Sequence, residues 1–496
     1  MPKMKKAISL LCSLAALTAM SVTAFADEPY EGYTYDWYGD ALPSQNGYVP
    51  EYELRGVDIE GCGAFNQPND MAVSASKKFF IADTLNNRIV ILDEKLAFIK
   101  ELKEFKDEDG STTTLKNPNG VYVTENDEIY IADTANARVI ACDMDGNIFA
   151  KFEKPDSSSY DKDTFEPQKV IVDKSNNVYV IVNNISKGAL SYIYDNVNDE
   201  VTFKGYYGTN RVQATSTVIA NKLWSYILTE EQMAKRQRSV PIEIANFDMD
   251  EDGFVYTVTS SKTQKTDVLK KLNPGGTNIF VGKGFSDYKF GDFSERYYNG
   301  QNYTSSIVDV DVGENGIINL LDFTTKRIFQ YNSECDLLFI FGGEGGQIGL
   351  FTYPTAVESL GDRIYVLDKS KNNITCFKRT EFGEYVHNAV DLHLQGLYDE
   401  ALVPWEEVLR RDGNYSFAYV GIGKAYLNAG EYKKAMDYFY LHSRPGYNKA
   451  FKYYRTEFIR NNFSIMVIVI AVIVIAIIVI KQIRKRRKKK AGVSDK

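Results

Sequence analysis

Residues 118–142 are the stretch that decides the fold, PNGVYVTENDEIYIADTANARVIAC. It contains short runs of β-branched and aromatic residues separated by Asn, Asp and Gly, which is the pattern of strands joined by tight turns. The same phrase stands 50 residues earlier, where residues 68–92 are PNDMAVSASKKFFIADTLNNRIVIL. A repeat of this length, built from strands and turns, is typical of a propeller or a solenoid.

Alignment on the last Asp of the phrase IYIAD gives six copies. The marked position falls at Asp83, Asp133, Val182, Thr259, Asp322 and Asp368. The intervals are 50, 49, 77, 63 and 46 residues, so the third and fourth intervals contain insertions. The insertion at 212–238 has an apolar stripe at helical spacing, and the one at 282–306 is a polar loop rich in Phe and Tyr. Each copy offers about four short strands, which is one propeller blade.

The second copy resembles the NHL repeat, whose pattern is close to Pro-x-Gly-Val-Ala-Val-Asp followed by Ile-Tyr-Val-Ala-Asp-Thr-x-Asn-x-Arg. The first and sixth copies match this pattern well, and the third and fourth match only its order of apolar residues. The resemblance extends over residues 52–380 and implies an all-β, six-bladed propeller. The last copy is one strand short, and we expect residues 52–57 to supply that strand and close the ring.

Three copies carry an Asp and an Arg five residues apart, on either side of a tight turn. The pairs are Asp83 and Arg88, Asp133 and Arg138, and Asp322 and Arg327. A carboxylate in this position can accept two bonds from a guanidinium group that folds back across the turn. We therefore expect these pairs to be structural, with a ligand contact as the alternative.

The third and fourth copies have lost this turn, and the two insertions flank the fourth copy. Departures gathered on one side of a regular ring predict a specialised sector, although ordinary drift explains them equally well. The candidate binding surface comprises the replaced Asp positions and aromatic residues of the insertions: Val182, Thr259, Trp224, Phe293, Tyr297, Tyr298 and Tyr303.

The pattern becomes helical after residue 380. A Gly-x-Tyr-x-x-Ala-x-x-x-aromatic phrase occurs at 396–405 and again at 430–439, a shift of 34 residues. It resembles the core of the tetratricopeptide repeat (TPR), in which a small Ala lets two helices approach each other. The resemblance implies TPR-like helices over 383–462 with the core residues Gly396, Tyr398, Ala401, Trp405, Gly430, Tyr432, Ala435 and Phe439.

Both ends of the chain carry targeting signals. Residues 1–26 combine three Lys, an apolar run and a final Ala-Phe-Ala, which is the layout of a secretory signal peptide. Residues 463–480 are almost unbroken Ile, Val and Ala, long enough for one transmembrane helix. The basic tail at 481–496 is placed in the cytoplasm by the positive-inside rule. We expect a single-pass protein of a bacterial cell membrane, lying mostly outside the cell, with an irregular lead-in at 27–51.

Charge is divided unevenly along the chain. The whole chain carries −8, while the signal segment contributes +3 and the tail +8, so residues 27–480 carry −19. A segment this acidic disfavours nucleic acid as a partner, unlike the RNA-binding role of some NHL proteins. The cysteines after the signal show no CxxC spacing, and we expect buried thiols, although the compartment permits a disulfide: Cys62, Cys142, Cys335 and Cys376.

No catalytic or cofactor motif stands out. Some NHL-like propellers resemble lyases that hold a metal with histidines, but His387, His393 and His442 all belong to the helical part. Gly-x-Ser-x-Gly, His-Glu-x-x-His and phosphate-binding loops do not occur in the sequence. We therefore expect no enzyme activity, no cofactor and no metal, with an NHL-type lyase as the remote alternative.

These expectations leave two binding functions. The first is a membrane-anchored extracellular scaffold, in which the propeller and TPR stalk bind proteins of the cell envelope, for instance beside a transporter. The alternative is capture or sensing of a ligand by the propeller, with a glycan stacking on exposed Tyr and Trp. The tail is too short for a signalling domain, which favours docking over signal transmission.

Overall fold

The computed structural model describes residues 28–490 except 108, 161, 212–240, 261–266, 281–288, 295 and 299–300. The side chains of 296–298, 301–303 and 488–490 are not described either. The expected signal peptide and the helical insertion at 212–238 lie outside the described residues. The chain divides into two compact units, Met1–Thr34 with Ala41–Glu384 and Tyr35–Asp40 with Tyr385–Lys496.

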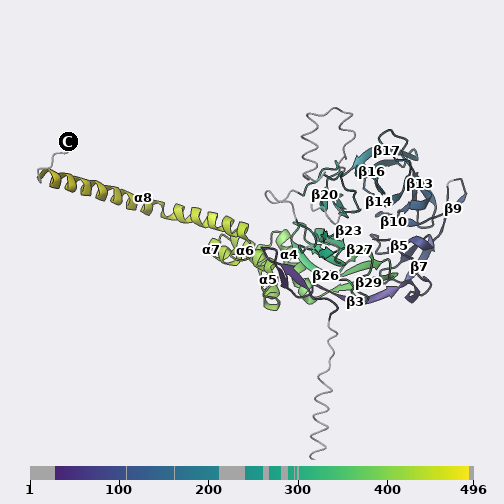
Figure 1. The fold of residues 1–496 in the computed structure, drawn as a ribbon, viewed down its shortest axis with the longest axis horizontal. Coiled ribbons are helices and arrows are strands. Elements are labelled where there is room, and N and C mark those ends of the chain that lie inside the picture. The colour runs from purple at the N-terminus through teal and green to yellow at the C-terminus, as the bar shows by residue number, and fades with distance from the viewer. Residues whose placement is uncertain are drawn as a thin grey trace, which may run out of the picture. The chain divides into compact units, whose positions relative to one another are not determined.

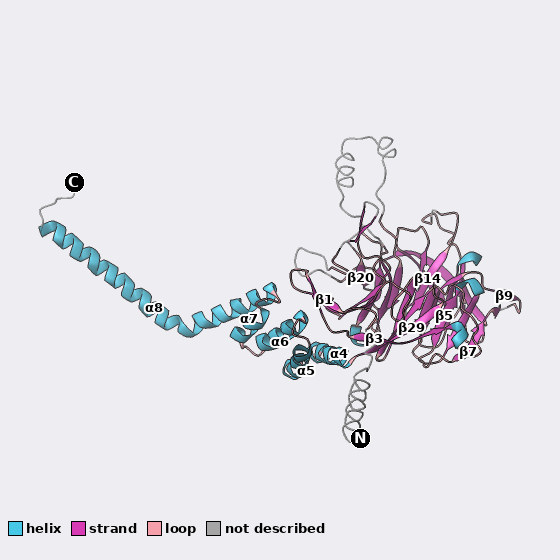
Figure 2. Ribbon diagram, turned by 60° about the horizontal axis from the view of Figure 1, so that its bottom comes forward, coloured by secondary structure: helices cyan, strands magenta, loops and turns pink. Residues whose placement is uncertain are grey.

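The first unit is a six-bladed β-propeller made of antiparallel sheets (Figure 1, Figure 2). The strands of each blade are given from the axis outward. Blade 1 is β4 (Asp70–Val73), β5 (Phe79–Asp83), β6 (Arg88–Leu92) and β7 (Phe98–Leu102). Blade 2 is β10 (Pro118–Val123), β11 (Ile129–Asp133), β12 (Arg138–Cys142) and β13 (Ile148–Phe152). Blade 3 is β14 (Pro167–Val172), β15 (Asn177–Val182), β16 (Ala189–Asp195) and β17 (Glu200–Tyr207). A small hairpin, β8 (Glu104–Lys106) and β9 (Thr112–Thr114), stands between blades 1 and 2.

Blade 4 differs from the others because it has three described strands, β18 (Asn246–Met249), β19 (Val255–Val258) and β20 (Leu269–Leu272). The expected aromatic loop follows it and contains a hairpin, β21 (Arg296–Tyr298) and β22 (Gln301–Tyr303). Blade 5 is β23 (Ile307–Val312), β24 (Ile318–Asp322), β25 (Arg327–Tyr331) and β26 (Leu337–Gly342). Blade 6 begins with β27 (Pro354–Leu360), β28 (Arg363–Asp368) and β29 (Asn373–Arg379).

Packing between blades explains why the repeated phrase is so apolar. Every residue of β5 and β11 is buried, because each second strand lies between two neighbouring sheets. Phe80 packs with Ile131 of blade 2, whereas Phe79 packs with Tyr365 of blade 6 at a ring-centroid distance of 4.6 Å. Alternate side chains of one strand therefore serve two different interfaces.

The ring is closed by a strand from the other end of the sequence, as expected. β3 (Tyr48–Arg55) pairs antiparallel with β29, and Cys376 faces Tyr52 in the register. The strand begins four residues before the expected start, and the short 3-10 helix Gly56–Asp58 ends it. Blade 6 thus has four strands, and β29 does not end the sheet as an open edge.

The lead-in at 27–51 is more ordered than expected. It contains a two-stranded hairpin, β1 (Tyr33–Tyr35) and β2 (Ala41–Pro43), and its last residues already belong to β3. Tyr30 is buried and donates a hydrogen bond to the carbonyl of Tyr48 at 2.7 Å. The expected irregular segment therefore contains short strands, which its sequence did not indicate because it has no regular alternation.

The helical region consists of α4 (Glu381–Leu394), α5 (Tyr398–Arg411), α6 (Ser416–Asn428), α7 (Tyr432–Phe439) and α8 (Arg444–Lys490). Helices α4 and α6 end in the same way, at glycines with φ of +81° (Gly396) and +79° (Gly430). The amide after each glycine reaches back to a carbonyl five residues earlier at 2.9 Å, which is a Schellman cap. The two phrases thus occupy equivalent places in two helix pairs.

Contacts between aromatic rings of one helix and glycines of its neighbour hold these helices together. Trp405 is 1% exposed, and a Cβ added at Gly421 would lie 2.5 Å from its ring. Phe439 lies against Gly423 in the same manner. The small Ala401 and Ala435 are 1% and 0% exposed. Adjacent helices therefore approach closely where a ring meets a residue without a side chain.

Helix α8 is long and apolar enough to cross a membrane, with a mean hydropathy of 3.6 over its most apolar 18 residues and none of that window buried. The expected span at 463–480 lies within it, and α8 continues without a break on both sides.

Candidate functional site

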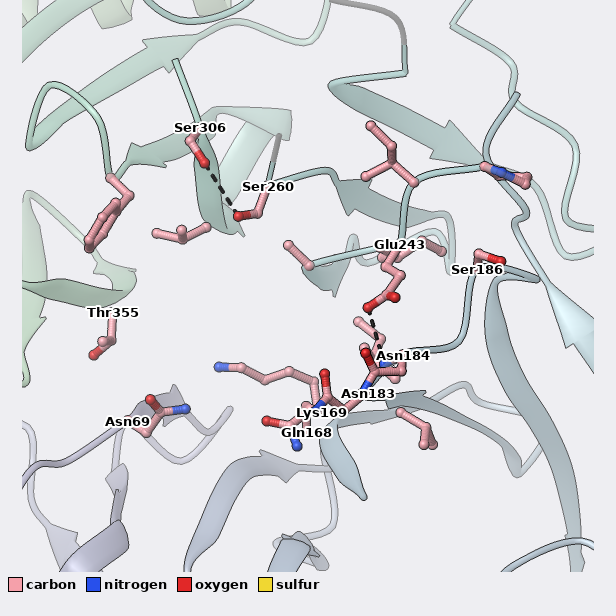
Figure 3. A pocket seen from close by; sticks show the side chains of 18 of the residues that line it. Asn69, Gln168, Lys169, Asn183, Asn184, Ser186, Glu243, Ser260, Ser306 and Thr355 are labelled. Atoms are coloured by element: carbon pink, nitrogen blue, oxygen red, sulfur yellow. Dashed lines mark hydrogen bonds between the residues drawn. The ribbon is translucent and has the colours of Figure 1, made fainter. Parts of the chain in front are cut away.

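A cavity of about 1030 Å³ opens where the innermost strands of the propeller begin. In Figure 3, Asn69, Gln168 and Lys169 stand along one side, and Ser260 and Ser306 stand opposite. The remaining wall comes largely from loops, and the lining residues used below are Val182, Asn184, Ser186, Glu243, Phe323 and Tyr353.

The repeated Asp organises the same face of the ring in blades 1 and 2. Asp133 is fully buried, and it accepts hydrogen bonds from the amide of Lys116 at 2.7 Å and from Asn136 and Arg138 at 2.8 Å. In blade 1, Asp83 binds Arg88 at 2.7 Å in the equivalent way. One carboxylate therefore ties the loop that enters its blade to the turn between the second and third strands.

The third expected pair does not form. Asp322 accepts bonds from Ser305 Oγ at 2.9 Å, the Ser306 amide at 2.7 Å and Thr325 Oγ1 at 2.5 Å. Arg327 turns instead toward Asp292, at 3.4 Å, and donates to the Tyr33 hydroxyl at 3.0 Å. The prediction was wrong because hydroxyl groups beside Asp322 take the place of the guanidinium.

Blades 3 and 4 lack this carboxylate, and both contribute to the cavity. Val182 replaces it in blade 3; it is 2% exposed and lines the cavity wall. Thr259 replaces it in blade 4, where its hydroxyl donates to the carbonyl of Asp267 at 2.8 Å and accepts from Asn210 at 3.0 Å. Thr259 itself does not line the cavity, but the next residue, Ser260, does. The two blades that lack the Asp turn thus both contribute residues to the cavity wall.

Several polar groups in the cavity wall remain available to a ligand. Within the described part of the chain, the side chains of Asn184 and Ser186 form no hydrogen bond. The backbone N–H of Asn184 donates to the Glu243 carboxylate at 3.2 Å. Ser260 and Ser306 are joined only through a long contact of 3.3 Å between their hydroxyls. These groups can both donate and accept hydrogen bonds.

An aromatic pair forms one edge of the cavity. Phe323 and Tyr353 meet edge to face with ring centroids 4.8 Å apart, and Tyr353 is 45% exposed. The ammonium group of Lys326 lies 3.1 Å from the centroid of the Phe323 ring. The exposed Tyr353 ring therefore offers an apolar surface with a polar tip beside hydrogen-bonding groups.

The floor of the cavity carries an ion pair. Lys169 projects from β14, is 8% exposed and forms a short ion pair with Asp70 of β4 across the axis. Asp309 of β23 hydrogen-bonds to Asn246 and accepts the Val357 amide at 2.6 Å. The buried positive charge is thus already balanced before any ligand arrives.

A second layer of carboxylates lies two residues further along the innermost strands. Asp248 accepts the Val312 amide at 2.7 Å, and Asp311 accepts the Ser359 amide at 3.2 Å, so both link neighbouring blades. Burial, together with the charge of Asp311, raises the pKa of Asp248 to about 7. Burial also raises the pKa of Glu358 well above its ordinary value. In the described ranges no three His, Cys, Asp or Glu side chains converge on a metal position.

Most aromatic residues of the candidate surface fall outside what the structure describes. Trp224 lies outside the described residues, and Tyr297, Tyr298 and Tyr303 belong to β21 and β22, whose side chains are not described. Phe293 is half-buried beside Lys289, whose ammonium lies 5.4 Å from the ring centroid. Of the three proposed residues whose side chains the structure describes, Val182, Thr259 and Phe293, only Val182 lines the cavity.

Lys169, Tyr353 and the axial carboxylates were not identified from the sequence. A signal for the axial residues was present, because Asp70, Lys169 and Asp309 each stand 13 residues before the aligned position of their copy, at Asp83, Val182 and Asp322. Polar residues at matching places in several repeats mark the surface that the repeats share, here the ring axis.

A comparison with protein-family profiles agrees with the propeller. The NHL repeat profile matches residues 115–141. None of the curated proteins matches the sequence. Among solved structures, virginiamycin B lyase from Staphylococcus aureus is 11% identical with a TM-score of 0.38, over 66% of this chain and 99% of the lyase. A protein from Lactobacillus plantarum is 12% identical with a TM-score of 0.38, over 72% of this chain and 90% of its own. Scores this low do not carry an activity or a site over to this chain.

Proposed function

We propose that this chain is a membrane-anchored binding protein whose propeller takes up a neutral, hydroxyl-rich ligand, such as an oligosaccharide, in the axial cavity. The observation that carries the proposal is the lining of that cavity, which brings together the side chains of Asn184 and Ser186, unpaired within the described chain, and an exposed tyrosine ring. Ligand sites are commonly cavities of about 300–1,000 Å³ with a few convergent polar groups.

The charge of the floor favours a neutral ligand. Lys169 is neutralised by Asp70, so an anion would have to displace a buried ion pair. Asn184, Ser186 and Ser260 instead offer uncharged donors and acceptors. Tyr353 can lie against the apolar face of a sugar ring while these groups bind its hydroxyls.

Binding by the full-length protein in detergent tests this proposal, using calorimetry against a panel of neutral oligosaccharides. Tyr353→Ala should weaken binding at least about tenfold, equivalent to ~1.4 kcal/mol. Tyr440→Ala removes a tyrosine that is 71% exposed and does not line the cavity, and should leave the affinity unchanged. Equal losses in both variants, or no binding by any sugar, would reject the proposal. We expect the sugar to be recovered unchanged after incubation with the protein, which would show that the protein binds it without turnover.

Protein docking by the helical region is a second candidate function. It is supported by the two helix pairs, whose glycine caps and buried aromatic residues, Trp405 and Phe439, repeat after 34 residues as in TPR proteins. Two such pairs fall below the three repeats that solenoids usually need, which favours a partner protein in the cell envelope, for instance a transporter. Crosslinking in the native membrane tests this function: a constant neighbour, lost when Leu441 and Tyr440 (63% and 71% exposed) are changed to Ser, would support it.

The anchor and its direction belong to the same proposal. The apolar part of α8 crosses the membrane, the basic residues after 480 remain in the cytoplasm, and the propeller lies outside the cell. Cysteine labelling with a membrane-impermeant reagent in whole cells tests the direction. A Cys introduced at Tyr38, which is 78% exposed, should react, and one introduced at Ser494 should not.

A further inference from the structure

An exposed aromatic stripe runs along α8 before its most apolar part. Phe451, Tyr454 and Phe458 are 43%, 37% and 52% exposed. Their spacing of three and four residues places them on one face of the helix. The rings of Tyr454 and Phe458 stack, with centroids 6.5 Å apart. These three residues are called the α8 stripe below.

The described helices of this unit do not cover the stripe. Burial on α8 ends at Ala450, which is 0% exposed and packs with Ala435 and Phe439. Every residue from 451 to 461 is exposed. A contiguous exposed patch of large apolar side chains marks an interaction surface.

Positive charge accompanies the stripe. Lys449, Lys452, Arg455 and Arg460 are all exposed, and Glu457 is the one acidic residue between 449 and 460. At 100° per residue, Lys452 and Arg460 lie on the side of the helix away from the stripe. Aromatic residues on one face with basic residues on the other are typical of helices that lie in a membrane interface. Residues 27–480 carry a net charge of −19, so this basic segment differs from the part of the chain around it.

Helix α8 can turn between this segment and the span. Figure 2 shows that the helix bends part-way along its length. Two side chains bond to carbonyls four residues earlier, Thr456 to Lys452 at 2.8 Å and Asn462 to Phe458 at 2.9 Å. Bonds of this kind loosen the backbone ladder and often bend helices.

We propose that residues 451–463 of α8 lie along an anionic membrane surface, with the α8 stripe at the boundary between headgroups and acyl chains and the basic residues against lipid phosphates. This inference rests on the proposed membrane span. The span brings the segment to the surface, and each nearby Lys or Arg contributes about 1 kcal/mol of attraction to an anionic leaflet. A second copy of this chain is the competing occupant, because the stripe also has the spacing of a helix–helix seam.

Spin labels on the full-length protein in lipid nanodiscs test the inference. Phe458→Cys reports the stripe, Lys452→Cys is the matched control on the other face, and Ile473→Cys reports the span. The four native cysteines of the described region are buried, and wild-type protein measures their residual labelling. Accessibility to oxygen and to a water-soluble nickel complex is compared in discs with and without phosphatidylglycerol.

In anionic discs, the oxygen-to-nickel ratio should be several-fold higher at 458 than at 452. Changing Arg455 and Arg460 to Glu should lower the ratio at 458. Equal ratios at both positions would overturn the inference, and strong dipolar coupling between labels at 458 would overturn it in favour of a second copy. Nickel access at 473 would instead show that the span itself fails, independently of the result at 458.

Discussion

Asp133 makes three connections with one side chain, and its burial makes each of them costly to lose. Its carboxylate holds an incoming loop through Lys116, a turn through Asn136 and the following strand through Arg138. A charge in such a site is stable only while its partners remain, because water cannot replace them.

Asp133→Ala should therefore destabilise the propeller by about 3 kcal/mol, since it leaves the Arg138 guanidinium without its buried partner. This change is measured by urea unfolding, with hydrogen exchange in peptides from β10–β13 as the probe of the unfolded fraction. Glu125→Ala is the control, because Glu125 pairs with Lys174 on the surface and its loss should cost less than about 1 kcal/mol. A loss as small in Asp133→Ala as in the control would contradict the buried network.

The axial carboxylates predict a stability that falls as the pH rises. Burial raises the folded pKa of Asp248 to about 7 from 3.8, so the folded state holds a proton that the unfolded state has released. Stability from this group is greatest below pH 4 and is lost between pH 4 and 7. Asp248→Asn should flatten that decline and stabilise the protein at pH 7.5, because an amide oxygen still accepts the Val312 amide.

Unfolding midpoints at pH 4.5 and 7.5 measure this effect. The decline should not vanish entirely, because burial also raises the pKa of Glu358 and of Asp311. An identical decline in Asp248→Asn and wild type would show that Asp248 is ionised in the folded protein.

Among the elements, helices α5 and α6 depend on a contact that permits no side chain. Gly421→Ala would place a Cβ 2.5 Å from the Trp405 ring, so the two helices must separate or the ring must shift. Overpacking of this kind typically costs about 1–3 kcal/mol. Thermal unfolding of the helical signal by circular dichroism should show a lower midpoint.

Gly413→Ala provides a matched control, since an added Cβ there meets no atom within 4 Å. The better helix propensity of Ala works in favour of the Gly421 variant, by about 1 kcal/mol. A midpoint that rises in Gly421→Ala would mean that propensity outweighs the contact and that Trp405 has room to move.

The elements also show what a sequence can and cannot predict. The strands of blades 1 and 2 follow from alternation and turn residues, and the closing strand follows because one blade was a strand short. The Arg327–Asp292 contact does not follow, because its partners lie 35 residues apart in a loop without a period. The cavity is equally hidden: Lys169 and Asp70 meet across the axis only after the blades have been arranged in a ring. Val182 could be predicted as a cavity residue because it replaces the repeated Asp, a difference that is visible within a single copy of the repeat.

At the scale of the whole molecule, the ring depends on β3. Deletion of residues 28–56 should leave β29 as an open edge, so the protein should aggregate or lose cooperative unfolding. Size-exclusion chromatography and urea unfolding measure both outcomes. Glu51→Ala keeps the strand and removes only its half-exposed pair with Arg363, so this variant should remain monodisperse. A deletion variant that unfolds like wild type would show that five intact blades and an open sixth are sufficient.

The pairing of β3 with β29 also sets an order of events during synthesis of the chain. β3 leaves the ribosome first, and its partner follows only after more than three hundred further residues have been made. Blades 1 to 5 can each form as their strands emerge, but the sixth must wait for a strand that has long been exposed. The early strand therefore remains without its partner through most of translation, and the ring can close only after blade 6 has been made.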